Sequence, residues 1–442
     1  MKKDKLTFKS YVLGMQHLFA MFGATVLVPL LTGLSISTTL LMAGIGTLLF
    51  HFISGGKVPA FLGSSFAFLG GYAAIAPFVD GKANLEMLPY ASLGVVFAGL
   101  LYLVVALLFK IFDVKKVMRY FPPVVTGPII IGIGLILAPT AIGNCKTNWG
   151  LAMVALITIV VCNIWGKGMI KIIPILMGIL VSSVVAIIMQ FAGVEVFEAG
   201  KIQAFKDAAW IGNPINMSQT VFAVKDAHLA VSAIIAIVPI AIAAMMEHIG
   251  DVSAISSTVG KNFIADPGLH RTLMGDGLAT SVSAMFGGPA NTTYGENTGV
   301  LALTKVYDPR VVRIAAVFAI ILSFSPKVAG LINLLPTAII GGVSLILYGM
   351  ISAIGVRNLV ENRVDLAASR NVIIVAIILV SALGFSSIGG LSFALFGTKI
   401  TFTGLAIAAI SGIILNAILP GKDFEFEAEE ENYSEKGVDF RA

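Results

Sequence analysis

The chain has 442 residues, of which 57% are hydrophobic and only 12% are charged. A soluble domain normally carries roughly 25% charged residues, so this composition excludes an ordinary soluble protein and indicates that lipid surrounds much of the chain. The net charge of +5 does not indicate a nucleic-acid partner, because the basic residues lie in short segments between apolar runs, as topology signals do. Two cysteines are too few for a disulfide framework or a metal site.

Apolar runs recur along the chain and predict membrane-spanning helices. They lie near 12–32, 37–54, 90–111, 123–143, 149–165, 172–192, 229–249, 311–325, 334–355, 371–388 and 400–419. A weakly apolar run at 270–288 is expected to be another span. Two further regions, 58–78 and 289–304, are shorter and are broken by Gly, Pro, Ser and Thr. The pattern predicts an all-α polytopic membrane protein with about fourteen transmembrane segments.

The placement of positive charge predicts the orientation of the chain. With the N-terminus in the cytoplasm, most of the 29 lysine and arginine residues fall in cytoplasmic segments, as the positive-inside rule requires. With an even number of crossings, both termini are then expected on the cytoplasmic side of a bacterial inner membrane. The acidic segment 421–442 is expected to be a solvated cytoplasmic tail.

An outer loop at 193–228 divides the chain into two halves, each with one interrupted segment. The interruptions, Gly63–Phe68 and Ala290–Asn297, occupy corresponding positions. Paired interrupted segments are typical of a substrate site between inverted repeats. With seven segments in each half, the second half enters the membrane in the opposite direction to the first.

Two acids, Glu247 and Glu296, fall where membrane depth is expected, and neither has a basic neighbour in its own span. Charged groups at such depth are costly and usually functional. Carboxylates accept N–H bonds, so two of them suit a neutral planar ring with two N–H donors. The alternatives are that Glu296 is an interfacial acid in a loop and that Glu247 ends a helix facing cytoplasmic water.

The interruptions supply the complementary donors. Free backbone amides of half-helices after Phe66 and after Gly295 would point at the carbonyl groups of such a ring. An aromatic side chain, Phe66 or Tyr294, is placed to pack on its face. Tyr348, in a later span, would either close over the site or brace two helices.

Energy coupling is expected to come from an ion gradient, because no phosphate-binding loop of the Walker type is present. Buried carboxylates can carry protons, and Ser- and Thr-rich breaks can supply oxygen ligands for Na⁺, so both ions stay open. Asp251 lies one helical turn after Glu247 and would relay protons or be hydrated. His17, in the first span, would carry a proton or make a helix-to-helix hydrogen bond.

The pattern does not indicate an enzyme. It contains no nucleophile–base pair and no metal cluster, and no cofactor or catalytic residue is predicted.

At these residues the chain resembles the nucleobase–ascorbate transporter family, and within it the bacterial uracil:proton symporters. The resemblance spans nearly the whole chain, and the stretches that carry it are Gln16–Pro29, Gly63–Phe68, Glu247–Asp251 and Thr292–Lys305. The last of these is similar to the family signature of an acid or Gln, then Asn, any residue, Gly, four residues, Thr and a basic residue.

The resemblance implies two inverted repeats of seven segments, with short strands in segments 3 and 10. It implies a core domain formed by 1–111 and 229–332, a gate domain formed by 112–192 and 333–420, a homodimer, and an elevator-like movement of core against gate.

For the site, the resemblance implies that Glu247 and Glu296 bind the base and that amides of Phe66 and Gly295 meet its carbonyl groups. The other residues that it places at the site are Tyr294, Tyr348, Ala24 and Ser65, with Glu247, Asp251, Glu296 and His17 carrying protons. Some uracil carriers have His where this chain has Asp251, which leaves the coupling ion open. Xanthine carriers tend to have Gln at the Glu296 position, so Glu296 favours uracil. The alternatives are a purine permease and a passive facilitator.

Overall fold

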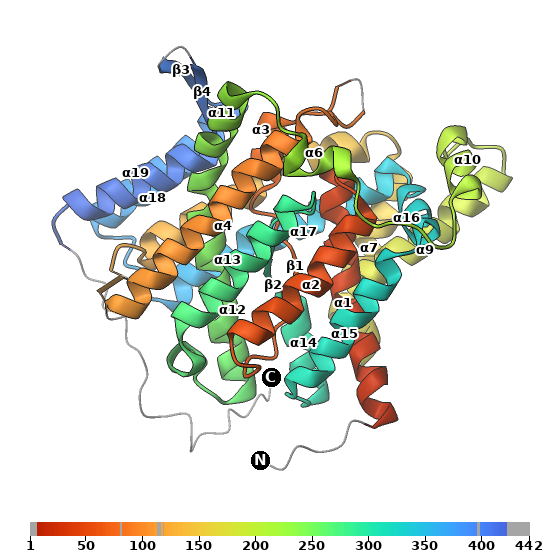
Figure 1. Cartoon of the computed structure of the whole chain (residues 1–442), viewed down its shortest axis with the longest axis horizontal. Coiled ribbons are helices and arrows are strands. Elements are labelled where there is room, and N and C mark those ends of the chain that lie inside the picture. The colour runs from red at the N-terminus through yellow and green to blue at the C-terminus, as the bar shows by residue number, and fades with distance from the viewer. Residues whose placement is uncertain (1–6, 80–81, 113–115, 118, 396–397, 422–442) are drawn as a thin grey trace.

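The computed structural model describes residues 7–79, 82–112, 116–117, 119–395 and 398–421. Most of this chain is helical, and the helices pack side by side in one body (Figure 1). The expected acidic tail, from residue 422 onward, lies outside the described residues.

The elements fall into two series joined by a long connection. The first series is α1 (Phe8–Thr32), α2 (Ile36–Ile53), β1 (Leu62–Ser64), α3 (Leu69–Ile75), α4 (Leu88–Ile111), α6 (Pro123–Cys145), α7 (Trp149–Trp165), α8 (Met169–Ile172) and α9 (Pro174–Phe191). The connection contains α10 (Ala199–Asp207). The second series is α11 (Ala227–Ile237), α12 (Ala241–Val259), α13 (Leu269–Met285), β2 (Asn291–Thr293), α14 (Gly295–Thr304), α15 (Pro309–Ser323), α16 (Pro326–Asn333), α17 (Thr337–Glu361), α18 (Ser369–Ser387), β3 (Leu391–Leu395), β4 (Thr398–Phe402) and α19 (Gly404–Ile418).

Local sequence explains where several helices begin and end. Ser35 and Asp226 precede α2 and α11, and their side chains accept hydrogen bonds from amides of the first turn. Pro309 occupies the first turn of α15, where its missing N–H costs nothing. Helix α1 ends at Gly33, whose φ of 83° is the left-handed conformation that favours glycine.

Eight of the described helical spans are long and apolar enough to cross a membrane, or nine if α15 and α16 count as one span bent by 87°. Helices α11 and α12 together form one of the eight, Ala227–Val259. Large apolar side chains are exposed on the outer helices, as at Val380 on α18, which is 71% exposed. Such surfaces need lipid to cover them, and the molecule is therefore a multi-pass membrane protein.

Helices that are distant in sequence pack as neighbours. Helix α6 packs on α17, α4 on α13, and α2 on α15. The helices α6 and α17 approach so closely at Gly134 that an added Cβ would lie only 2.1 Å from the backbone oxygen of Tyr348. Small residues allow this kind of approach between membrane helices.

The two interrupted segments meet near the middle of the molecule (Figure 1). Strands β1 and β2 pair antiparallel, with Leu62 opposite Thr293 and Ser64 opposite Asn291. The short strands expected in these segments are therefore present. Each strand leads into a helix, β1 into α3 and β2 into α14.

The prediction of a chain that is helical apart from the two interruptions is wrong at one place. The segment 391–402 forms an antiparallel hairpin of β3 and β4, and the helix expected near 400–419 begins only at Gly404. Gly389 and Gly390 have positive φ values that end the preceding helix. The residues that follow include β-branched and aromatic side chains, which favour strands. This strand pattern is much shorter than the apolar runs of the helices, and it was therefore missed. The turn into α16 and the helix α10 in the outer loop were also not predicted.

Candidate functional site

The crossing of β1 and β2 extends beyond the paired residues. The Ser65 amide donates to the Ala290 carbonyl (2.8 Å), and the Tyr294 amide donates to the Phe61 carbonyl (3.0 Å). The strand backbone is therefore hydrogen-bonded as in a small sheet, up to Ser65 on the first side and Tyr294 on the second. This fixes the starts of the two helices relative to each other.

Backbone amides remain unused just after each strand. Within the described chain, the amides of Phe66, Ala67 and Phe68 make no backbone hydrogen bond before α3 begins. Helix α14 begins at Gly295, and the side chain of the preceding Tyr294 makes no capping hydrogen bond, although the Glu296 carboxyl group interacts with its own backbone amide. Unused amides at a helix start are donors with a favourable dipole behind them. The predicted donor groups at Phe66 and Gly295 are thus available.

Glu247 and Glu296 reach the same region from two helices. Glu247 lies within α12, which continues to Val259, and Glu296 lies in the first turn of α14. Both side chains are half-buried, and their carboxyl groups interact electrostatically. Neither forms a salt bridge with a Lys or Arg of the described residues. Because α12 continues past Glu247, the alternative that this acid ends a helix is wrong.

Asp251 lies one turn after Glu247 and faces the start of α14. Its Oδ2 accepts a hydrogen bond from the hydroxyl of Thr293 (2.9 Å), and a Cβ at Gly295 would lie 3.7 Å from its Oδ1. The structure therefore places Asp251 beside the unused amides of α14. It adds a third carboxyl group to the one region.

Tyr294 braces the crossing. Its ring is buried and packs over Gly63, where an added Cβ would lie 2.5 Å from the ring. Its hydroxyl donates to the Ser64 carbonyl (3.0 Å) and accepts from Thr25 (3.3 Å). The hydroxyl is therefore already used inside the protein.

Two other predicted residues make different contacts. His17 accepts a hydrogen bond at Nδ1 from the side-chain amide of Asn297 (3.1 Å), which also donates to the His17 carbonyl. This is the helix-to-helix contact that was one of the two expectations. Tyr348 lies on α17 and lines a groove with residues of α6 such as Leu135. No hydrogen bond in the described chain joins it to Glu247 or Glu296.

The remaining predicted residues line the first interruption. Ala24 on α1 is fully buried, and Phe66 and Ser65 are almost so. The Ser65 hydroxyl has no hydrogen-bond partner among the described residues.

Three buried polar residues beside the acids were not predicted. They are His248, which follows Glu247; Asp276 on α13; and Tyr102 on α4, and each is fully buried. The charges of Asp276 and Glu247 both act on the Tyr102 hydroxyl. The signal for Asp276 is an acid within the weakly apolar segment 270–288, the same rule that identified Glu247. The described residues contain no group of three or more His, Cys, Asp or Glu side chains arranged to hold a metal ion.

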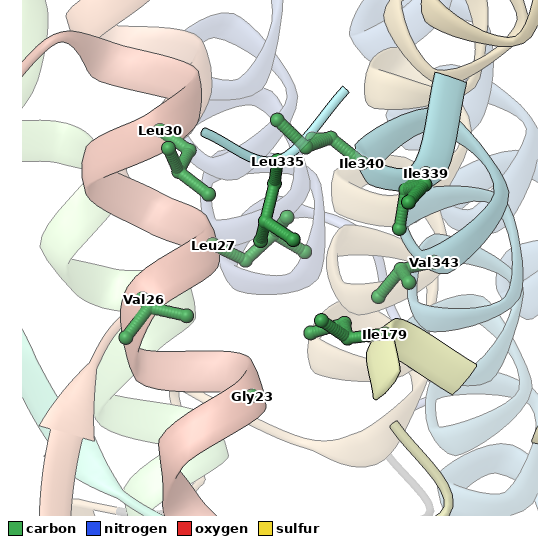
Figure 2. A pocket seen from close by; sticks show the side chains of 9 residues that line it. All are labelled: Gly23, Val26, Leu27, Leu30, Ile179, Leu335, Ile339, Ile340 and Val343. Carbon is green, nitrogen blue, oxygen red and sulfur yellow. The ribbon is translucent and has the colours of Figure 1, made fainter. Parts of the chain in front are cut away.

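A narrow gap lies between α1, α9 and α17. Figure 2 shows its lining, which is entirely apolar: Gly23, Val26, Leu27, Leu30, Ile179, Leu335, Ile339, Ile340 and Val343. It offers no polar group to a substrate. Its importance is that α1, which reaches the strand crossing, meets α9 and α17 through an apolar contact.

Long apolar helices around a central crossing that carries acids define a membrane transport protein, not an enzyme. The chain belongs to the Permease family, whose model matches residues 8–391. It is 41% identical to the uracil permease of Bacillus caldolyticus over 430 residues, covering 95% of this chain and 94% of that protein. It is 39% identical to the uracil permease of Bacillus subtilis, with 95% and 94% covered. It is also 39% identical to the putative pyrimidine permease RutG of Escherichia coli, with 95% and 91% covered.

Solved structures share the fold at low sequence identity. The transmembrane domain of the cyanobacterial bicarbonate transporter BicA superposes with a TM-score of 0.62 at 17% identity, covering 87% of this chain and 98% of that one. The anion transporter SLC26A9 superposes with a TM-score of 0.61 at 13% identity, covering 92% and 64%. At such identity the likeness concerns the fold alone.

Proposed function

We propose that this protein imports uracil, or a closely related nucleobase, across the bacterial inner membrane by proton-coupled secondary transport. The observation that carries the proposal is the meeting of Glu247 and Glu296 beside two sets of unused amides at the strand crossing. The names of the relatives, uracil and pyrimidine permeases, agree with it.

Recognition follows from donors and acceptors. Uracil is neutral and planar, with two N–H donors and two carbonyl acceptors. The carboxylates of Glu247 and Glu296 accept the N–H bonds, and the amides near Phe66 and Gly295 donate to the carbonyl groups. Phe66, Ala24, Ser65, Tyr294 and Tyr348 surround the ring in this proposal.

The proposed architecture groups the elements into fourteen segments in two inverted repeats of seven. The first repeat runs from α1 to α9 and the second from α11 to α19, with β1–α3 and β2–α14 as the third segment of each. Segments 1–4 and 8–11 form a core domain and the others a gate domain. Both termini are cytoplasmic, and the protein is a homodimer.

Alternating access is proposed to occur by movement of the core against the gate. The apolar contact in Figure 2, between α1 of the core and α9 and α17 of the gate, supports this, because it contains no polar bond that movement would break. Glu247, Glu296 and Asp251 are the proposed proton carriers, since no Lys or Arg in the described chain forms a salt bridge with them. His17 is already bonded to Asn297 and is a weaker candidate.

Uptake into proteoliposomes tests the function. With an inward proton gradient, labelled uracil is expected to accumulate above the external concentration, and an uncoupler is expected to abolish the accumulation. Equilibration without accumulation would identify a facilitator. Stronger competition by xanthine than by unlabelled uracil would identify a purine permease. Accumulation driven by a sodium gradient at equal pH on both sides would identify Na⁺, instead of the proton, as the coupling ion.

A further inference from the structure

A buried histidine–aspartate pair lies behind the candidate site. His248 is next to Glu247 on α12, and Asp276 lies on the neighbouring helix α13. The His248 Nδ1 is 3.3 Å from Asp276 Oδ2, and both side chains are fully buried. The proposed transport mechanism so far gives neither residue a role.

Helices α2 and α4 close directly over this pair. The Phe50 ring meets the His248 imidazole edge-on, with centroids 6.1 Å apart. A Cβ at Gly277, next to Asp276, would lie 2.4 Å from the Cβ of Tyr102. The approach of these helices keeps the pair away from bulk water.

The pair has few hydrogen-bond partners for so buried a position. Beyond the 3.3 Å contact with each other, neither oxygen of Asp276 has a hydrogen bond within the described chain, and neither does Nε2 of His248. No described Lys or Arg forms a salt bridge with Asp276. A bare carboxylate beside a neutral imidazole would be costly here. The pair therefore holds one proton more than a neutral imidazole beside a carboxylate, as imidazolium with carboxylate or as imidazole with carboxylic acid.

Thr293 connects the pair to the candidate site. Its Oγ1 is 3.5 Å from His248 Nδ1 and donates to Asp251 Oδ2 at 2.9 Å. Asp251 in turn lies beside Gly295. One hydroxyl on β2 thus stands between a fully buried pair and a carboxyl group of the site.

We infer that His248 and Asp276 store a proton that is exchanged with Asp251 through the hydroxyl of Thr293. This inference rests on the proposed proton-coupled transport and deepens it. In the transfer, the Nδ1 proton of His248 passes to Thr293 Oγ1, while the hydroxyl proton of Thr293 passes to Asp251 Oδ2. The number of protons and the total charge are unchanged: the His248–Asp276 pair goes from neutral to one negative charge, and Asp251 goes from carboxylate to carboxylic acid.

The groups around the pair favour such a store. The ionisable side chains that interact with Asp276 are Tyr102 on α4 and Glu247 and Asp251 on α12, and Glu296 on α14 interacts in turn with Glu247 and Asp251. All of them are acids, so His248 is the one group of this cluster that becomes positive. Neutralising Asp251 lowers the repulsion among the carboxyl groups when a neutral base binds.

Asp276→Asn separates a proton store from a purely structural contact. The amide has the same shape and can still donate to His248, but it cannot hold the proton. The full-length protein in proteoliposomes is expected to retain uracil counterflow, which needs no net proton movement. Its proton-driven accumulation is expected to fall to that of uncoupler-treated wild type, and the pH dependence of uracil uptake is expected to flatten.

Thr293→Val is the second arm, because it removes the connecting hydroxyl and leaves the pair in place. It is expected to keep counterflow and lose accumulation in the same way. If Asp276→Asn does not fold, this variant decides the question. Ser281→Ala is the control: Ser281 is also buried on α13, but it bonds to the Val96 carbonyl on α4, and its accumulation is expected to match wild type.

A folded Asp276→Asn or Thr293→Val protein that accumulates uracil like wild type, with the same pH dependence, would overturn the inference. The proposed function fails in a different way, since the wild type itself would then neither exchange nor accumulate uracil.

Discussion

The interruption at β1 and the interruption at β2 pair with each other, yet only the second carries ionisable side chains. After β1 come Ser65 and Phe66, which offer unused amides and an apolar ring. After β2 comes Glu296, and Thr293 of the strand itself binds Asp251. The same backbone arrangement thus appears twice, and the charge is concentrated on one side. A ring held between them would receive backbone donors from both sides but would find carboxylates only near α12 and α14.

Glu296→Gln removes the acid of the second interruption and is expected to have the largest effect. The amide accepts one N–H but also presents its own donors to the substrate, so uracil binding should weaken by about 2–5 kcal/mol, the scale for a broken buried charged pair. Calorimetry on purified protein measures it. Glu361→Gln, an exposed acid paired with Arg357 on α17, is the control. Equal affinity in wild type and Glu296→Gln would mean that Glu296 does not hold the base.

Gly63→Ala tests the packing of the first interruption against the second. A methyl group there meets the Tyr294 ring at 2.5 Å and the Thr25 hydroxyl at 2.8 Å. The Tyr294 ring is held in place because its hydroxyl is bonded to Ser64 and to Thr25. Overpacking of this kind lowers the free energy of unfolding by about 1–3 kcal/mol, which a thermal melt detects. Gly70→Ala on α3, with no atom within 4 Å, is expected to melt at or above the wild-type temperature.

Asn291→Ala removes a polar side-chain anchor of the second interruption. The buried side-chain amide donates to the Met42 carbonyl on α2 (3.1 Å), and losing this buried hydrogen bond between β2 and α2 costs about 1–2 kcal/mol. The melting temperature should fall accordingly. Asn362→Ala, an exposed change at the end of α17, serves for comparison. Similar melting of both variants would contradict the anchoring role.

Ser65→Ala is expected to have the smallest effect on folding. The Ser65 hydroxyl is buried without a partner among the described residues, and the fold uses only its amide. Removing an unsatisfied buried hydroxyl should change the free energy of unfolding by less than about 0.5 kcal/mol. A loss as large as that of Asn291→Ala would show that the two interruptions depend on side chains equally.

Much of the fold follows from the sequence, because long apolar runs form helices whatever their partners. The two interruptions were visible as Gly-, Ser- and Thr-rich breaks, and their short strands are present. The hairpin at 391–402 was missed because its alternation covers few residues. The sharp bend at Ser325, between α15 and α16, was missed because a Pro that ends one span also suits the start of the next helix.

The site was predictable where a single residue violates the rules of its segment. Glu247 and Glu296 stand out as acids in apolar surroundings, and the structure brings them together. Asp276 breaks the same rule, but its segment is only weakly apolar, so the contrast is small. The Tyr294 hydroxyl makes its hydrogen bonds inside the protein, to Thr25 and Ser64. These residues are distant in sequence, so no local pattern predicts the contact.

The central claim is that Glu247 and Glu296 hold the N–H groups of a neutral base. Calorimetric binding of uracil, 1-methyluracil and 3-methyluracil to wild type and to Glu296→Gln tests it most directly, because each methyl group removes one N–H. The wild type should bind uracil more tightly than both methylated bases, and Glu296→Gln should lose that preference for at least one of them. Undiminished binding of both methylated bases to the wild type would contradict the claim.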